Sequence, residues 1–359
     1  MSTRTKLLQA KRVTHRVNAS VVDLFCGAGG LSHGFKLEGF SLAAGIDLDE
    51  ACRFPYVENN GAPFIRKDVA ELTPTAVEQL FTPGAAKVLV GCAPCQPFSV
   101  YNQKNDDPKW RLLNSFGQLI DAVRPDVVSM ENVPRLLQFK GGGVFQSFVK
   151  LLKNGGYHVV WGVLYGPDFG LAQTRSRLVL LASRLGEIAL PRPTLRGPYR
   201  TVRDVIGKMP RLRHGEADLT DPLHCASKLS DVNLRRIVAA KPGGTWRDWD
   251  QELVTACHKE KTGKGYGAVY GRMEWAEPAP TITTQFFGFG NGRFGHPEQD
   301  RGLSLREGAL LQSFPAYYKF AAPGERVQFK TVGRLVGNAV PVRLARVIAR
   351  TLRKHIEAN

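Results

Sequence analysis

Short apolar runs alternate with longer amphipathic stretches from about residue 19 onwards. Four early runs are rich in β-branched residues and lead into polar or glycine-rich turns: SVVDLF (20–25), SLAAGIDLD (41–49), KVLVGCAP (87–94) and PDVVSMENV (125–133). A later pair of strands is expected at YHVVWGVLY (157–165) and RLVLLAS (177–183). Helical spacing is found between the strands in LSHGFKLEGF (31–40) and WRLLNSFGQLIDAVR (110–124). This alternation predicts an α/β fold with a doubly wound, largely parallel sheet.

The pattern changes after about residue 186. The segment LPRPTLRGPYR (190–200) is rich in Pro and Arg and is expected to be a connection. The stretch from about 190 to 300 has little periodicity and carries many Gly, Pro, aromatic and basic residues. Loops of this kind commonly carry recognition, although aromatic residues packing the core of an ordinary α+β domain are the alternative. Helical spacing returns at 304–313 and in the basic stretch 341–356, whose arginines are expected on a solvated face.

The charge balance favours a polyanionic partner. The 359 residues include 49 Lys and Arg against 32 Asp and Glu, which gives a net charge of +17. Such a charge attracts phosphates, although a basic protein without a nucleic-acid role remains open. No apolar run approaches the roughly 20 residues of a membrane helix, so no membrane span is expected. Residues 1–18 are basic and lack the apolar core of a secretion signal, so we expect a short arm and a cytoplasmic protein.

The six cysteines are scattered along the chain, which favours reduced thiols over a disulfide framework. Cys92 and Cys95 are three residues apart, but a redox pair normally opens a helix, and Cys92 is still in an apolar strand. A zinc ribbon needs a second pair, whereas Cys225 and Cys257 stand alone, so no metal is expected. Cys95 remains as a candidate nucleophile. A thiol has a pKa of about 8.5, so it requires activation or acid assistance at the substrate.

Chemically active residues gather where strands end. The stretch DLFCGAGG (23–30) is a strand running into glycines, which let the backbone approach a ligand. Asp47 ends the next strand, where a carboxylate can bind both ribose hydroxyls of a nucleoside cofactor. Asp68 follows a third strand and can meet an adenine amino group, although a solvated turn is equally compatible. Glu131 ends another strand, and Arg175 and Arg177 are two apart in an extended chain, where each alone fits a surface ion pair.

Taken in order, these motifs resemble those of the bacterial-type DNA (cytosine-5)-methyltransferase family. DLFCGAGG resembles the family's first motif, and APCQPFS (93–99) its catalytic loop. ENV (131–133) is similar to its acid motif and QTRSR (173–177) to its Gln-x-Arg-x-Arg motif. SLREGALLQSFP (304–315) and VGNAVP (336–341) resemble its last two motifs. The resemblance implies a class I S-adenosylmethionine-dependent methyltransferase, with a Rossmann-like doubly wound sheet and a smaller, irregular target-recognition domain.

The resemblance also implies the chemistry. Cys95 would add to C6 of cytosine, which makes C5 carbanion-like and able to take a methyl group from S-adenosyl-L-methionine. Glu131 would hold or protonate N3, and Arg177, with Arg175, would bind O2 and steady Glu131. Because C5 chemistry is unreachable inside a duplex, the base would be flipped out. Removal of the C5 proton and β-elimination would then release Cys95.

The resemblance implies the cofactor site position by position: Asp23, Phe25, Gly27, Gly29, Asp47, Asp68, Val69, Pro94 and Asn338. Four departures from the family pattern are present. Asp47 stands where the family usually has Glu, and Ala93 where it usually has Pro. The loop after Cys95 lacks the glycine that the family often has near Asn102, so its closure is expected to differ from the family pattern. Cys92 fills a position usually held by glycine, and we expect it to pack without a role in turnover.

The expected organisation has three parts. Residues 1–18 form the arm, 19–186 and 330–359 the catalytic domain, and 187–329 the target-recognition domain. Double-stranded DNA would lie in a basic cleft between the two domains, near the nucleoid, with the enzyme acting as a monomer and a restriction endonuclease encoded separately. PAPTITTQ (278–285) resembles a short family pattern near the end of the recognition region. Base contacts are expected from loops in 220–300, such as those around Trp246, Arg247, Arg272 and Arg293.

Two other functions remain open from the sequence. A related branch methylates cytosine in tRNA and carries Cys-Phe-Thr in the recognition region, where the nearest candidate here is CHK (257–259). A DNA-binding module that has lost catalysis would show degenerate motifs. Here Cys95, Glu131 and both arginines are intact, which favours an enzyme.

Overall fold

A seven-stranded sheet forms the centre of the computed structural model, which describes residues 16–94, 108–260 and 263–359. The strand order is β3-β2-β1-β4-β5-β8-β6. Pairs within β3-β2-β1-β4-β5 are parallel, whereas β8 is antiparallel to both β5 and β6. The strands are β1 (Ala19–Leu24), β2 (Ser41–Asp47), β3 (Phe64–Arg66), β4 (Ala86–Gly91), β5 (Val127–Asn132), β6 (His158–Tyr165) and β8 (Ser176–Ser183). The predicted doubly wound, mostly parallel sheet is confirmed.

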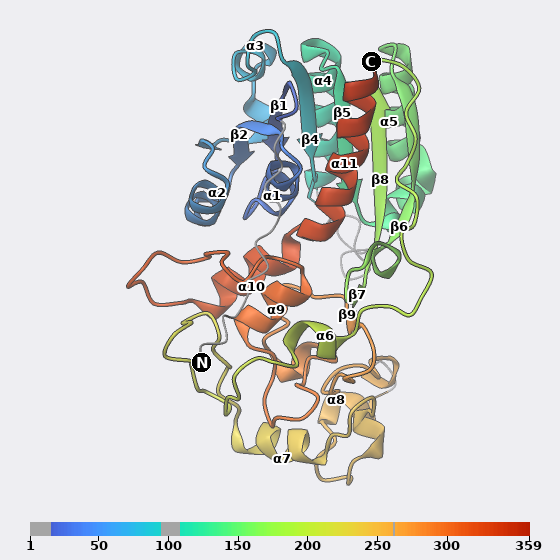
Figure 1. Cartoon of the computed structure of the whole chain (residues 1–359). Coiled ribbons are helices and arrows are strands. Elements are labelled where there is room, and N and C mark those ends of the chain that lie inside the picture. Colours follow the sequence, from blue (N-terminus) through green and yellow to red (C-terminus); the bar gives the residue numbers. More distant parts are fainter. Residues whose placement is uncertain (1–15, 95–107, 261–262) are drawn as a thin grey trace.

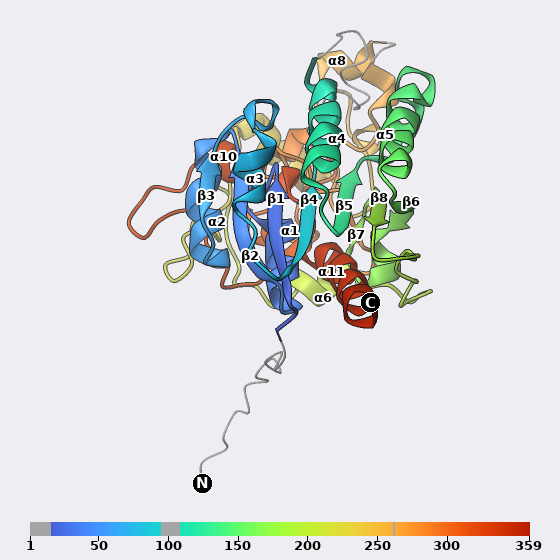
Figure 2. The same ribbon diagram turned by 90° about the horizontal axis from the view of Figure 1, so that it is seen from above.

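Helices cover both faces of the sheet (Figures 1 and 2). Consecutive strand residues point to opposite faces, so each face carries its own apolar cluster. On one face, Val21 and Val179 pack with residues of α1 (Gly30–Leu37) and α11 (Val342–Ala358). On the other face, Val22 and Leu180 pack with residues of α4 (Leu112–Val123) and α5 (Gly143–Asn154). The sheet therefore lies between two helical layers, which leaves the strand ends available for a site.

The C-terminal helix α11 is clamped to α1. A Cβ on Gly34 would lie 2.4 Å from the Ala345 Cβ, so this glycine permits close approach of the two helices. Arg346 and Arg350 both pair with Glu38, whose side chain is 8% exposed. The basic face of this helix is therefore solvated as expected, with the Arg346 and Arg350 side chains 42% and 53% exposed, but it is also paired with Glu38. Among the described residues, no helix combines the length and apolar character needed to cross a membrane.

The region between 187 and 329 shares a core with the sheet domain. Tyr56 and Phe64 belong to the same apolar cluster as Phe286, Phe314 and Tyr318. Its regular elements are short: α6 (Val202–Ile206), α7 (Asp231–Ala239), α8 (Ala256–Lys259), β9 (Ala279–Pro280) and α9 (Leu305–Leu311). β9 pairs in parallel with β7 (Gln173–Thr174), which precedes this region in the chain. The next helix, α10 (Phe329–Asn338), begins near the predicted boundary. The short helices and strands of this region agree with the irregular structure expected there. The division of the chain into two domains stays a prediction.

A smaller apolar cluster lies at the far end of the molecule, around α7 (Figure 1). It contains Leu229, Ile237, Trp246, Trp249, Leu253 and Phe289. Trp246 is only 7% exposed and stacks on the His258 ring at 4.4 Å between centroids. The aromatic residues of this segment therefore pack largely against one another.

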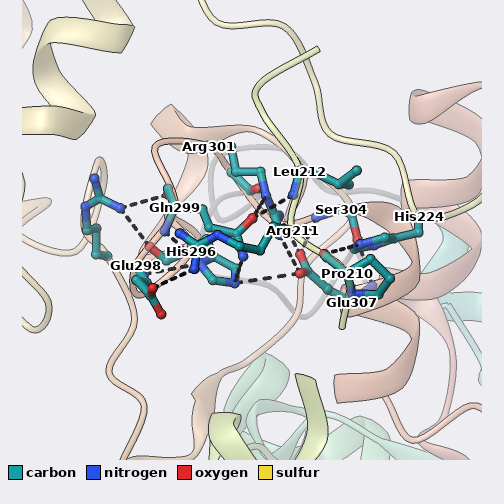
Figure 3. Close-up of polar contacts among 12 residues, drawn as sticks. Pro210, Arg211, Leu212, His224, His296, Glu298, Gln299, Arg301, Ser304 and Glu307 are labelled. Carbon is teal, nitrogen blue, oxygen red and sulfur yellow. Dashed lines mark hydrogen bonds and ion pairs between the residues drawn. The ribbon is translucent and has the colours of Figure 1, made fainter. Parts of the chain in front are cut away.

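A buried polar network ties the loops before α9 together (Figure 3). Arg301 and Glu307 are completely buried, and two guanidinium nitrogens of Arg301 donate to the two Glu307 oxygens, each at 2.7 Å. The Ser304 N–H also donates to Glu307 at 2.8 Å, which completes a capping box at the start of α9. His224 Nδ1 lies 2.9 Å from Ser304 Oγ. Irregular backbone is thus held by side-chain hydrogen bonds in place of a sheet.

Candidate active site

A cavity of about 400 Å³ opens at the carboxyl ends of the parallel strands. Its position matches the switch point between β1 and β4, where doubly wound sheets bind ligands. Its volume lies in the range of small-molecule sites. Eight of the nine residues predicted for the cofactor line it: Asp23, Phe25, Gly27, Asp47, Asp68, Val69, Pro94 and Asn338.

The ninth residue, Gly29, lies beside the cavity, at the start of α1. Its φ is +87°, and a Cβ there would sit 2.2 Å from Asn60 Nδ2. Gly29 is therefore needed for backbone conformation and packing behind the cavity wall.

The turn after β1 has an unusual backbone. Phe25 has φ +59° and Gly27 has φ +53°, and the Phe25 value is uncommon for a side chain of this size. A Cβ on Gly27 would meet no heavy atom within 4 Å, so the turn is open at this point. The Gly27 N–H donates to Asp47 Oδ2 at 2.9 Å, which ties the turn to the end of β2. Strain of this kind is often found at ligand sites.

Asp47 is held by backbone donors at both oxygens. Its Oδ2 accepts from Gly27, and its Oδ1 accepts from the Asp49 N–H at 3.0 Å. Burial raises the pKa of Asp47, and the hydrogen bond from Gly27 opposes this shift. Each carboxylate oxygen can accept further hydrogen bonds, so the side chain can still bind hydroxyls. Asp49 also pairs with Arg334 of α10, which brings the end of the chain to the same wall.

The Asp23 carboxylate lines the cavity, and one of its two oxygens lacks a hydrogen-bond partner among the described residues. Its Oδ2 accepts from Ser32 Oγ at 2.6 Å, whereas its Oδ1 has no hydrogen-bond partner among the described residues. Burial raises the pKa of Asp23 to about 7. A bound cation would relieve this cost, because an opposite charge favours the ionised carboxyl. The residues present therefore fit a positively charged ligand such as S-adenosyl-L-methionine.

Glu131 and Arg177 meet across two adjacent strands. Glu131 on β5 lies opposite Val179 on β8, and Arg177 is two residues from Val179, on the same face. Arg177 Nε lies 2.8 Å from Glu131 Oε1 as an ion pair, although the N–H is not aligned for a hydrogen bond. The two side chains are 12% and 3% exposed. The structure thus brings the predicted acid to one of the two predicted arginines.

Arg175 lies elsewhere. One guanidinium nitrogen donates to the Ile282 carbonyl at 3.1 Å, and another to the Ala339 carbonyl at 3.5 Å. The neighbouring Gln173 side chain accepts from the Ile282 N–H at 2.9 Å. The first half of QTRSR therefore contacts the segment around Ile282, while Arg177 is the arginine that forms the ion pair with Glu131.

The candidate nucleophile Cys95 and Asn102 both lie outside the described residues. The chain up to Pro94 is fixed by neighbouring strands, since Asn132 Nδ2 donates to the Ala93 carbonyl at 3.0 Å. Cys92 lines the cavity, and its Sγ donates to Glu131 Oε2 at 2.8 Å. The expectation that Cys92 only packs did not foresee this contact.

Other cavity residues were not predicted from the sequence. They are Cys26, Ala28, Leu31, Leu48, Asp49, Cys52, Lys67, Cys92, Ala93, Lys109, Leu112, Arg334, Leu335, Ala339 and Val340. Five of them lie within the motifs quoted above, which could have pointed to them: Cys26, Ala28, Ala93, Ala339 and Val340. Asp49, Lys67 and Arg334 carry no signal of their own. Within the described residues, no cluster of three His, Cys, Asp or Glu suits a metal ion.

Two expected base-contacting residues are buried in the recognition region. The Arg272 guanidinium donates to the carbonyls of Ile237 and His296 at 2.7 and 3.0 Å, and its residue is 5% exposed. The side chains of Arg272 and Trp246 are therefore buried in this structure, while base contacts from the loops in 220–300 stay a prediction. Arg293 is half-buried and donates to the Gly244 carbonyl at 2.8 Å. Arg247 is exposed, with its guanidinium 4.9 Å from the Trp246 ring centre.

Comparisons with known proteins identify the family of this chain. Residues 19–354 match the family model described as C-5 cytosine-specific DNA methylase. The chain is 52% identical over 340 residues to the Type II methylase M.HgiDII of Herpetosiphon aurantiacus, covering 94% of this chain and 96% of that protein. It is 30% identical to the Type II methyltransferase M1.HphI of Haemophilus parahaemolyticus, covering 97% and 90%.

A solved structure supports the same fold. An E. coli prophage-encoded chain, assigned as a DNA modification methyltransferase, superposes with a TM-score of 0.74 at 20% identity. The superposition covers 95% of this chain and 100% of that chain. At this identity the likeness concerns the fold alone.

Proposed function

The chain belongs to the C-5 cytosine-specific DNA methylase family and is a DNA (cytosine-5)-methyltransferase, and we propose that it acts by base flipping and a covalent Cys95–C6 intermediate. The target is one short sequence of double-stranded DNA. One observation carries this proposal. Cys92 lines the cavity, and its thiol donates a hydrogen bond to the Glu131 carboxylate. A cofactor in the cavity and a base at Glu131 would thus be neighbours.

The proposed chemistry assigns a role to each side chain. The Cys95 thiolate adds to C6. Glu131 protonates N3 or holds it by a hydrogen bond, which draws electron density from the ring. C5 then becomes nucleophilic and takes the methyl group. A base, such as water, removes the C5 proton, and β-elimination breaks the S–C6 bond and restores the Cys95 thiolate. Arg177 keeps Glu131 oriented and binds O2, whereas Arg175 supports the site through the 279–284 segment.

The cofactor in this proposal is S-adenosyl-L-methionine, whose sulfonium supplies an activated methyl group. Asp47 binds the ribose hydroxyls, while Asp68 and Val69 meet the adenine. Phe25, Gly27 and Pro94 form the walls, and Asn338 closes the far side. The Asp23 carboxylate, whose Oδ1 has no hydrogen-bond partner among the described residues, balances the positive charge of the cofactor. Gly29 supports the turn from behind.

DNA would bind between the catalytic part, 19–186 with 330–359, and the recognition region, 187–329. The net charge of +17 supports a polyanionic substrate. Extrusion of the base is required because the reacting carbon is shielded within the duplex. We further propose that the enzyme acts as a monomer in the cytoplasm, at the nucleoid, beside a separately encoded restriction endonuclease.

The test is base-resolution deamination sequencing of plasmid DNA from cells expressing the wild type or the Cys95→Ala variant. We expect one short motif to be protected with the wild type only. Purified Cys95→Ala should retain DNA binding, because loss of the thiol spares the phosphate contacts. Protection by the variant would contradict the covalent mechanism. Absence of protected cytosine with the folded wild type would contradict the proposed substrate and lead to tests on RNA.

A further inference from the structure

Glu131 is approached from both sides by different strands. Arg177 of β8 lies against Oε1 at 2.8 Å, and the Cys92 thiol, just after β4, donates to Oε2 at 2.8 Å. In this contact the thiol donates and the carboxyl oxygen accepts. Among the described residues, Oε1 receives no aligned hydrogen bond, whereas Oε2 accepts one from the Cys92 thiol.

We propose that Cys92 is a positioning residue that orients the Glu131 carboxylate toward the target base. The inference rests on the proposed function, in which Glu131 contacts cytosine. Glu131 is 3% exposed, so its orientation is set by protein groups rather than by water. A charge-assisted hydrogen bond at one oxygen and a cation at the other fix the rotation of the carboxyl group. A carboxylate free to rotate would spend less time aligned with N3.

The backbone of Cys92 is itself well placed for this role. Gly91 pairs with Met130 in the parallel register of β4 and β5, so Cys92, the first residue after β4, follows on beside Glu131 of β5. The Cys92 N–H donates to the Leu24 carbonyl at 3.4 Å, which connects the residue to β1. Asn132 then fixes the next residue through the Ala93 carbonyl. The backbone that carries the Cys92 thiol is therefore held by β4, which precedes it, and by contacts with β1 and β5.

The test separates hydrogen bonding from packing with a matched pair of variants. Cys92→Ser keeps a donor but is slightly smaller, whereas Cys92→Val fills the space without a donor. Cys92→Ala provides a second donor-free variant should valine disturb folding. For each folded protein, the single-turnover rate of tritiated methyl transfer to unmethylated plasmid DNA is measured, together with the Kd for S-adenosyl-L-methionine. Because Cys92 also lines the cavity, the Kd reports any purely structural damage there.

We expect Cys92→Val and Cys92→Ala to slow methyl transfer by about tenfold, with a cofactor Kd within about twofold of wild type. Cys92→Ser should remain within about threefold of the wild-type rate. Equal rates for valine and wild type, or a loss in serine equal to that in valine, would overturn the inference while the wild-type activity keeps the proposed function intact. A wild type that transfers no methyl group to cytosine would overturn the proposed function and this inference with it.

Discussion

Arg177 Nε lies 2.8 Å from Glu131 Oε1, and both side chains are largely removed from solvent. Their strands are neighbours in the sheet, and the antiparallel register puts both side chains on one face. Removing one partner of such a pair leaves a buried charge without compensation, which is costly. The ion pair therefore contributes both to the stability of the β5–β8 pairing and to the orientation of the Glu131 carboxylate.

Replacing Arg177 by alanine should impair chemistry more than cofactor binding. We expect the single-turnover rate to fall by about 100-fold, because Glu131 loses its cation and the base loses a donor. The Kd for S-adenosyl-L-methionine should stay within about threefold, since Arg177 does not line the cavity. Rapid-quench kinetics and calorimetry measure the two quantities. Arg184→Ala, at the opposite end of β8, is the control and should match wild type; lost cofactor affinity with unchanged turnover in Arg177→Ala would contradict the assignment.

Cofactor affinity should increase as the pH rises through 7. Burial raises the pKa of Asp23 to about 7, so the carboxyl is largely neutral at pH 6 and ionised at pH 8. Only the ionised form attracts a cation, so the Kd should fall by up to about tenfold over this window. Titration calorimetry between pH 5.5 and 8.5 measures the effect. Asp23→Asn, which still accepts from Ser32, should flatten the profile; an unchanged slope in this variant would assign the effect to another group.

Glu307→Ala should strongly destabilise the fold. Burial acts to raise the pKa of Glu307, but hydrogen bonds and charge from Arg301 outweigh it and lower the pKa to about 2. Since the folded-state pKa lies below the unfolded value, this stabilisation is present above about pH 4.5 and is lost as the pH falls toward 2.

At pH 7, the free energy of unfolding should fall by about 4 kcal/mol in Glu307→Ala, because Arg301 would be left buried and unpaired. Urea denaturation at pH 7 provides the measurement. Glu298→Ala is the matched control (Figure 3), since it removes an exposed partner of Arg211. That control should cost less than about 1 kcal/mol. Equal losses in the two variants would show that burial of the Arg301–Glu307 pair does not decide its contribution.

Arg247 and Arg272 should give opposite phenotypes. Arg247 is exposed beside the Trp246 ring, so Arg247→Ala should weaken DNA binding by about tenfold and reduce its salt dependence, with stability unchanged. Arg272 is buried against carbonyls, so Arg272→Ala should lower the free energy of unfolding by about 3 kcal/mol. Fluorescence anisotropy with plasmid-derived duplexes at several salt concentrations, together with urea denaturation, distinguishes the two. A stable Arg272→Ala protein with weakened DNA binding would restore Arg272 as a DNA contact.

Much of the sheet and cavity could be predicted because the signals are local. The apolar runs gave β1, β2, β4, β5, β6 and β8 within a few residues, and glycines and carboxylates at strand ends marked the cavity wall. Arg334 could not be found this way, because it is separated from Asp49 by 285 positions in the sequence and meets it only when the chain folds. The burial of Trp246 and Arg272 could not be predicted, because an irregular segment shows no periodicity from which burial can be inferred.

The sequence by itself determined the strand–helix alternation, the order of the motifs and the residue types at the strand ends, since these follow from local composition and spacing. Only the tertiary structure decided which partners those residues take. It assigned Arg177 to Glu131 and Arg175 to backbone carbonyls, although the two are separated by a single residue. It also brought the Cys92 thiol to Glu131. The physical reason is that side-chain pairing depends on strand register and on packing between distant segments, which local spacing does not specify.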